Sequence, residues 1–291
     1  MSTWGQLRLS LRLTAPGIAD DLLDEWLNAR YSSVLDAYPW KGLDANAMLE
    51  SVAAYSAGTV TATGGSTAVA GVGTTFVTGF TGYRIIFAGR RELYTFTYVS
   101  ATSGTLDRVF EGVTTAGLGY TLFQNIYDLP ADCKTVQSIE SPETGLDLDE
   151  WSKKKIGQSI GFPCEFGCPE VYAISEDTPE SRPPVLHTVE FYPIPNVTQG
   201  FPLRYQRAAL GFDGSATGAA PLPWINDSLL LNGARADARL HIKDMAGFAA
   251  YEGKFKGDLA QAIDVDVRRR KQGAVRMDPM WTEYRRNRVS R

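Results

Sequence analysis

The stretch GTVTATGGSTAVAGVGTT, residues 58–75, marks the point at which the character of the chain changes. Glycine, threonine, valine and alanine dominate it, and the charged residues that favour helices are scarce. β-Branched residues fit the pleated surface of a strand, whereas paired glycines favour turns. The same texture continues to Ile126, so we expect residues 58–126 to form a separate β-domain.

Short strands separated by glycine-containing turns are expected throughout this β-domain. Strands at such close spacing are typical of a small antiparallel barrel or sandwich. Tyr94, Phe96 and Tyr98 alternate along one strand and therefore share one sheet face, which we expect to face the core. The predicted strands are Thr59–Thr63, Tyr83–Ala88, Leu93–Val99, Thr105–Val109 and Tyr120–Ile126.

Two helices are expected before the β-domain. Between Ile18 and Tyr38, apolar residues recur at steps of three and four, which predicts an amphipathic helix ended by Pro39. A second helix is expected over Asp44–Tyr55, with Asp44 as its N-cap and Gly58 just beyond its end.

Residues 127–221 have a mixed character. One short helix is expected there, at Leu148–Ile156, together with several strands; Pro193 and Pro195 end one of them because proline cannot donate to a sheet. The predicted strands are Lys134–Ile139, Glu170–Ile174, His187–Tyr192 and Pro202–Arg207.

Helical periodicity returns near the C-terminus. It predicts one helix over Ile225–Asp244, capped by Asn226 or Asp227, and a longer one over Gly247–Lys271. The final stretch, Gln272–Arg291, loses this periodicity and is expected to be an extended arm, mobile in the free subunit and ordered on a partner.

These elements predict an α+β fold: a helical bundle core with an inserted small antiparallel β-barrel or sandwich domain and an extended C-terminal arm. The expected divisions are N-terminal core helices at 1–57, the inserted β-domain at 58–126, a mixed strand and loop part of the core at 127–221, C-terminal core helices at 222–271 and the basic arm at 272–291.

Charge is distributed unevenly. Nine basic and two acidic side chains lie between Val267 and Arg291, a net charge of +7, so residues 1–266 carry −11 of the overall −4. A basic end on an acidic body favours a tail that binds an acidic partner, while a solvated terminus explains it equally well.

No catalytic motif is found, so we expect a protein that is not an enzyme and needs no cofactor. The glycines of residues 58–75 lack the lysine of a phosphate-binding loop, and carboxylate pairs such as Asp147/Asp149 and Asp264/Asp266 read as solvated surface. Cys133, Cys164 and Cys168 fall short of the four ligands of a structural zinc site and are expected to be buried thiols. Neither a secretory signal nor a membrane span is expected.

Three stretches resemble the head-to-tail adaptor, or connector, proteins of tailed bacteriophages, including the tubular-tail adaptors of short-tailed phages. The first is the insert Gly58–Ile126 leading into Tyr127–Pro130. The second is Val189–Pro195 followed by Leu203–Tyr205, and the third is Leu222–Trp224, which opens a long helix.

The resemblance implies a structural virion protein at the head-tail junction, assembled in the host cytoplasm. It implies a ring of neighbouring copies, commonly twelve, that docks to the portal protein, continues the DNA channel and offers a platform to the next tail or nozzle protein. Packaged DNA would pass without sequence-specific binding, and no membrane is involved. An acidic body suits that passage, because a cationic wall would hold phosphates.

The basic end supplies the candidate portal-binding residues. Aromatic side chains and arginines are the residue types that most often anchor interfaces. The candidates are Arg268, Arg269, Arg270, Lys271, Arg276, Met280, Trp281, Tyr284, Arg285, Arg286, Arg288 and Arg291.

A competing hypothesis is a tail protein that binds a receptor or glycan through the β-domain. It requires a row of exposed aromatic side chains, which Phe76, Phe80, Tyr83, Tyr94, Phe96 and Tyr98 could supply. A DNA-binding protein that acts through the arginine-rich end is a further alternative, and it predicts retention on DNA that weakens steeply with salt.

Overall fold

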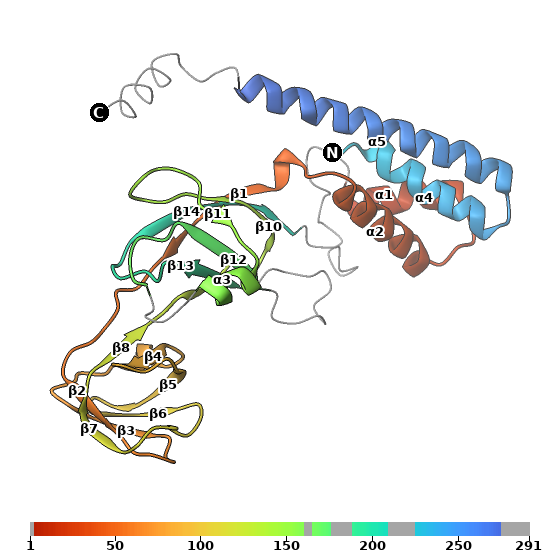
Figure 1. The fold of residues 1–291 in the computed structure, drawn as a ribbon. Coiled ribbons are helices and arrows are strands. Elements are labelled where there is room, and N and C mark those ends of the chain that lie inside the picture. Colours follow the sequence, from red (N-terminus) through yellow and green to blue (C-terminus); the bar gives the residue numbers. More distant parts are fainter. Residues whose placement is uncertain (1–2, 160–164, 176–187, 209–224, 275–291) are drawn as a thin grey trace. The chain divides into compact units, whose positions relative to one another are not determined.

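A computed structural model describes residues 3–159, 165–175, 188–208 and 225–274 of the chain (Figure 1). The fold is a mixed α+β fold that contains a curled antiparallel half-barrel sheet. The chain divides into two compact units, residues 1–44 with 209–291 and residues 45–208. We call them the helical unit and the β unit.

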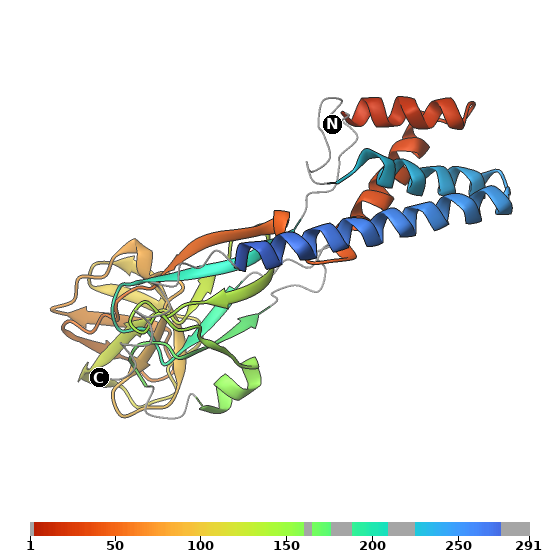
Figure 2. The same cartoon turned by 90° about the horizontal axis from the view of Figure 1, so that it is seen from above.

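The helical unit brings together helices from both ends of the chain. Its elements are α1 (Trp4–Thr14), α2 (Asp20–Asp36), the short 3-10 helix η1 (Lys41–Leu43), α4 (Asp227–His241) and α5 (Met245–Ala274). One hydrophobic cluster joins the four α-helices, and its members include Trp4, Leu11, Leu27, Tyr31, Leu230 and Phe255. In Figure 2, α4 lies between α1 and α5.

Helix α1 was not expected from the sequence, although a capping box marks its start. The Thr3 hydroxyl accepts a hydrogen bond from the Gln6 amide at 3.3 Å, and the Gln6 side chain accepts one from the Thr3 amide at 2.8 Å. Trp4, Leu7 and Leu11 then face the core at helical spacing.

The other α-helices of this unit were predicted as helices from the sequence, but their first and last residues differ from the predicted ones. Helix α2 lies within the predicted Ile18–Tyr38, Asn226 is the N-cap of α4, and α5 begins two residues before Gly247. Helix α5 also continues to Ala274, so the first three residues of the predicted arm are helical.

The second predicted helix, Asp44–Tyr55, is wrong. Residues Asp44–Glu50 form the strand β1, which pairs with β14 (Gly200–Arg207). Ala45, Ala47 and Leu49 alternate with exposed residues and pack on the β-unit core, so burial follows a period of two. The predicted helix Leu148–Ile156 is wrong in its first half, where β11 (Asp149–Glu150) precedes α3 (Lys153–Ser159).

Seven strands of the β unit form the half-barrel, in the order β7-β2-β3-β6-β5-β4-β8. The strands are β2 (Thr59–Ala62), β3 (Ala68–Val72), β4 (Arg84–Phe87), β5 (Leu93–Ser100), β6 (Ser103–Leu106), β7 (Thr115–Leu118) and β8 (Tyr120–Phe123), with a 3-10 turn, η2, at Thr78–Phe80. Only Gly119 separates β7 from β8, so one stretch of chain pairs with β2 at one edge and with β4 at the other. The sheet curls around its own aromatic core.

Two smaller sheets complete the β unit. The first has the order β1-β14-β10, with β10 at Cys133–Ile139; the second has the order β11-β12-β13-β9, with β12 at Val171–Ser175, β13 at Thr188–Tyr192 and β9 at Ile126–Asp128. Both sheets contribute to one cluster that includes Leu49, Tyr127, Phe191, Phe201 and Leu203. The described part of residues 127–208 therefore packs within the β unit, whereas the sequence grouped it with the helices.

The chain passes between the half-barrel and the smaller sheets twice, once near Tyr55 and once near Leu122, and these two segments are neighbours. Tyr55 and Leu122 exchange both backbone hydrogen bonds, each 2.8 Å long. Beside them Phe123 packs edge-on against Phe166, with ring centroids 5.4 Å apart, and Ile86 packs against Ile194. The half-barrel is thus tethered at two neighbouring points.

We expect the half-barrel to be removable. Replacing residues 56–121 with Asn-Gly would close the Tyr55–Leu122 pair as a two-residue hairpin, the loop length that such a hydrogen-bonded pair favours. The rest of the chain should still unfold cooperatively, with its helical circular dichroism intact. Loss of any cooperative transition in thermal unfolding would show that the half-barrel is needed for folding.

Candidate partner-binding surface

The candidate surface begins on α5, and the start of that helix is firmly held. The Asp244 side chain accepts a hydrogen bond from the Gly247 amide at 2.9 Å and also contacts Arg239 at 3.4 Å. Phe255 then enters the core of the helical unit, with Leu259 and Ile263 packed against it. The basic residues at the far end of α5 therefore project from an anchored helix.

Arg270 is bound within its own unit. Its Nε donates to the buried Asp266 carboxylate at 3.2 Å, its Nη2 donates to the Pro39 carbonyl, and its guanidinium lies 5.5 Å from the centre of the Tyr38 ring. The Lys41 amide donates to the same carboxylate oxygen at 3.2 Å. Arg270 fastens α5 to the segment after α2, so we assign it a structural role.

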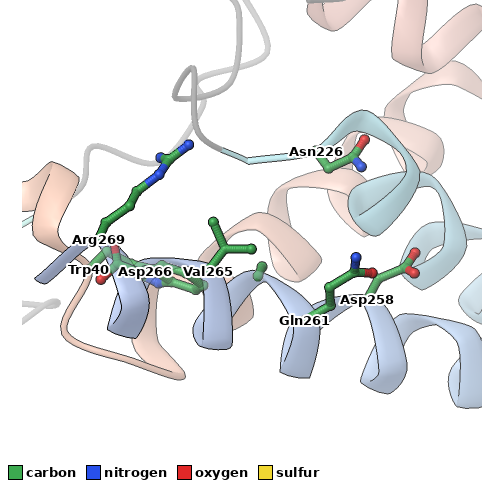
Figure 3. A pocket seen from close by; sticks show the side chains of 8 residues that line it. Trp40, Asn226, Asp258, Gln261, Val265, Asp266 and Arg269 are labelled. Atoms are coloured by element: carbon green, nitrogen blue, oxygen red, sulfur yellow. The ribbon is translucent and has the colours of Figure 1, made fainter. Parts of the chain in front are cut away.

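Arg268, Arg269 and Lys271 are exposed. Arg268 contacts Asp264 at 2.5 Å, but both side chains are more than half exposed, and such surface pairs add little stability. Arg269 lines a small cavity of about 190 Å³ with Trp40, Asp258 and Val265 of the same unit. Figure 3 shows the side chains of Arg269 and Val265 along α5 and Asn226 across from them at the start of α4.

The remaining candidates lie outside the described residues. They are Arg276, Met280, Trp281, Tyr284, Arg285, Arg286, Arg288 and Arg291. The structure therefore places Arg268, Arg269 and Lys271 at the exposed end of α5, while Arg270 makes contacts within its own unit.

A partly buried ion network, not foreseen from the sequence, links α2, α4 and α5. Arg30 donates to both oxygens of Asp237, at 2.7 and 2.6 Å, and its Nη1 lies 3.0 Å from Glu252. Hydrogen bonding to Asp237 is the main reason that the pKa of Arg30 is raised. Gly233 makes room for this arrangement, because a Cβ there would lie 2.9 Å from the Arg30 side chain.

The β unit holds one carboxylate whose burial affects its pKa. Glu190 on β13 accepts a hydrogen bond from the buried Asn125 side chain at 2.8 Å, where the chain passes from β8 to β9. Burial raises the pKa of Glu190 above its ordinary value of 4.5, while the charges of Lys153 and Arg84 and the bond from Asn125 act in the opposite direction.

This pKa predicts a pH-dependent stability. Because the folded state holds the Glu190 proton more tightly than the unfolded state, stability should fall as the pH rises from 4.5 through the raised pKa. Glu190→Gln keeps an acceptor for Asn125 without a charge, so the variant should lack this slope and be more stable than the wild type at neutral pH. Denaturant unfolding at several pH values checks it; equal slopes for the two proteins would contradict it.

The described cysteines and histidine do not form a metal site. Burial raises the pKa of the Cys133 thiol to about 11, and Cys168 contacts the Ser141 hydroxyl at 3.6 Å. His241 packs against Trp26 with ring centroids 5.5 Å apart. Among the residues that the structure describes, no group of three His, Cys, Asp or Glu side chains could hold a metal; Cys164 and His187 lie outside them.

The aromatic residues of the half-barrel are core residues. Phe76, Tyr94 and Phe96 are buried, and Phe80, Tyr83 and Tyr98 pack against them half-buried. The prediction that Tyr94, Phe96 and Tyr98 share a core-facing side is confirmed. These six residues do not supply the exposed aromatic row that a glycan-binding face requires.

The interpretation of the two carboxylate pairs as solvated surface is confirmed for Asp147, Asp149 and Asp264, which are exposed, and is wrong for Asp266. Asp266 is buried and pairs with Arg270, four residues later on the same helix. Among the described residues, no helix has the length and hydropathy to cross a membrane.

No protein-family model matches this chain, and no curated protein matches it. Its function is therefore proposed from its own residues.

Proposed function

We propose that this chain is a structural subunit of a tailed-bacteriophage particle, a head-to-tail adaptor that assembles into a ring beneath the portal. The ring would dock to the portal, continue the DNA channel and offer a platform to the next tail component. In this proposal the helical unit is the core of a helical bundle in the ring, and residues 275–291 extend α5 as an arm.

One observation carries the proposal: α5 packs in one core with helices from the N-terminal part of the chain, and its last turns carry a cluster of exposed basic side chains. This cluster lies where the basic C-terminal segment of the sequence begins. Arg268, Arg269 and Lys271 are exposed there, while Arg270 secures the helix. A rigid helix that leads into a segment rich in arginine and aromatic residues suits attachment to a larger acidic partner, because such residues supply strong anchors.

Charge elsewhere in the chain supports the same function. Residues 45–208 contain eleven basic and seventeen acidic side chains, a net charge of −6. Cationic surfaces hold DNA because their binding releases counterions from the phosphates. A channel wall with a net negative charge would release none, so DNA could pass without being retained.

Binding to the portal tests the proposal. The full chain should co-sediment with DNA-filled, tailless heads of its phage and with the isolated portal protein, but not with heads that lack the portal. Failure to bind portal in both forms would overturn the proposal. Tight binding to free double-stranded DNA at physiological salt would favour a DNA-binding protein instead.

A further inference from the structure

The chain leaves the half-barrel and enters the second of the smaller sheets at Asn125. This residue lies two positions after the end of β8 and directly before β9, and it is only 5% exposed. Its backbone carbonyl accepts a hydrogen bond from the Phe191 amide of β13 at 2.8 Å, and its side-chain amide donates to the carboxylate of Glu190 at 2.8 Å. Asn125 therefore fastens this crossing to β13 through two hydrogen bonds.

One half of the Asn125 side chain is unsatisfied. Its Nδ2 is bonded to Glu190, but its Oδ1 is buried and has no hydrogen-bond partner in the part of the chain that the structure describes. A buried carbonyl oxygen without a donor costs free energy, because it has given up its hydrogen bonds to water. An ionised carboxylate does not supply the missing donor, since both of its oxygens only accept.

A protonated Glu190 would supply that donor. A neutral carboxylic acid carries one O–H donor and one carbonyl acceptor, and a primary amide likewise both donates and accepts. Placed side by side, the two groups exchange a pair of parallel hydrogen bonds. The bond from Asn125 Nδ2 to Glu190 Oε1 is the first of them. The second would run from the protonated oxygen of Glu190 to Asn125 Oδ1.

The cross-strand neighbours of Glu190 are apolar. Val189 and Phe191 belong to the core shared by the two smaller sheets, so Glu190 lies on the opposite face of β13. Its partners across the strands are Ala173 of β12 and Ile126 of β9. Neighbours of this kind do not stabilise a negative charge.

Charged groups near Glu190 act in both directions. Lys153 and Arg84 favour its ionised form, and Lys153 also donates to the Ser175 hydroxyl at 2.8 Å. Burial nevertheless outweighs both cations and raises the pKa of Glu190, so the site favours the neutral acid. The titratable groups around Glu190 are Lys153 of α3, Arg84 of β4, the exposed Asp128 of β9 and Tyr192 of β13.

We propose that Glu190 and Asn125 form a proton-operated latch between the half-barrel and the second sheet. With Glu190 protonated, two hydrogen bonds join the pair and hold the crossing against β13. With Glu190 ionised, its proton passes to solvent, one bond remains, and Asn125 Oδ1 lies unpaired beside a negative charge, so the end of the β9–β13 pairing opens more often. The latch does not depend on the adaptor function, because it lies wholly within the β unit.

A pH titration followed by nuclear magnetic resonance tests the latch in the full chain. The Glu190 carboxyl carbon and the Asn125 side-chain amide should titrate together, with one midpoint above 4.5. Over the same range the Phe191 amide should lose about tenfold of its protection against hydrogen exchange, after correction for the intrinsic rate, because one hydrogen bond is lost. Protection that stays constant while Glu190 titrates would overturn the latch.

Low concentrations of urea distinguish opening of the latch from unfolding of the whole chain. The latch exposes little surface when it opens, so the exchange of Phe191 should not depend on urea below the unfolding transition. Exchange that accelerates with urea as steeply as global unfolding would show that the crossing has no separate opening, which contradicts the proposal.

Glu190→Gln is the closest mimic of the protonated latch. A glutamine amide also exchanges two hydrogen bonds with Asn125, and it does so at every pH. The variant should therefore keep the protection of Phe191 at its acidic value up to neutral pH. The matched control is Glu170→Gln, which removes an exposed carboxylate just before β12 and should retain the wild-type pH dependence. A Glu190→Gln variant that loses protection like the wild type would refute the latch.

Exchanging the two groups tests the pair itself. Asn125→Asp places two carboxyl groups face to face, so at neutral pH it should lower the protection of Phe191 below that of the wild type. Adding Glu190→Gln restores one acid and one amide of unchanged size, in reversed positions. The double variant should recover the wild-type pH dependence. A double variant no better protected than Asn125→Asp alone would show that the two side chains do not act as a pair.

Discussion

Replacing Arg30 with methionine should destabilise the helical unit by about 3 kcal/mol, the cost of leaving a partly buried carboxylate without its cation. Asp237 would lose its cation and Glu252 would keep only Lys256, 3.6 Å away, and each of these carboxylate side chains is only 20% exposed. Because Arg30 joins α2, α4 and α5, the loss should appear in the unfolding of the helices. Chemical denaturation followed by helical circular dichroism measures it.

Two control variants make this prediction specific. Arg12→Met removes an exposed pair with Asp20, 3.6 Å long, and should change stability by less than about 0.5 kcal/mol. Replacing Arg30, Asp237 and Glu252 together with Met, Leu and Gln should recover much of the loss, because no uncompensated charge remains. A single Arg30→Met variant as stable as the Arg12→Met variant would refute the assigned role of the network.

Ending the chain after Ala274 should abolish attachment to portal-bearing heads while leaving the unfolding of the purified protein unchanged within about 0.5 kcal/mol. This end point retains the whole of α5, including Arg268–Lys271, and removes Trp281, Tyr284 and the last five arginines. Aromatic and arginine anchors contribute most of the binding free energy in typical interfaces, so their removal should be decisive.

Point variants separate those anchors from the net charge of the segment. Trp281→Ala combined with Arg285→Ala should weaken binding to the isolated portal at least about a hundredfold, which two lost anchors account for. The matched control Arg286→Lys keeps the charge and should weaken binding less. If the double variant binds portal as tightly as the wild type, these residues are not the anchors.

Segments with a clear helical period, such as Ile18–Tyr38 and Gly247–Lys271, were predicted correctly as helices. Local propensity predicted the wrong element where tertiary packing determines the secondary structure. Residues 45–50 contain alanine, methionine, leucine and glutamate, which are good helix formers, and Asp44 resembles an N-cap. Pairing with β14 nevertheless places Leu49 in a β core and makes this segment a strand. The alternation of Ala45, Ala47 and Leu49 was the signal that could have revealed it.

Short elements escaped detection because their sequences carry little information. Strands β3 and β7 consist mainly of small residues, AVAGV and TAGL, and are defined by their neighbours in the sheet. In α1 the exposed Leu9 and Leu13 blur the amphipathic pattern that Trp4, Leu7 and Leu11 create. The Thr3–Gln6 capping box was the available clue to that helix.

The candidate site could be predicted only in part for a related reason. Arg268, Arg269, Arg270 and Lys271 look equivalent in sequence, but only the fold brings the Pro39 carbonyl to Arg270. The spacing of Asp266 and Arg270 was a usable hint of an internal pair. The Arg30 network was beyond sequence reasoning, since its partners Asp237 and Glu252 meet Arg30 only after both ends of the chain have packed together.

Electron microscopy of the full chain mixed with isolated portal is the most direct test of the adaptor function. We predict a closed ring of this protein, coaxial with the portal ring, with an open central channel. Both proteins should be folded and at concentrations high enough for weak binding to be seen. Particles in which the portal then carries no added ring would contradict the central claim.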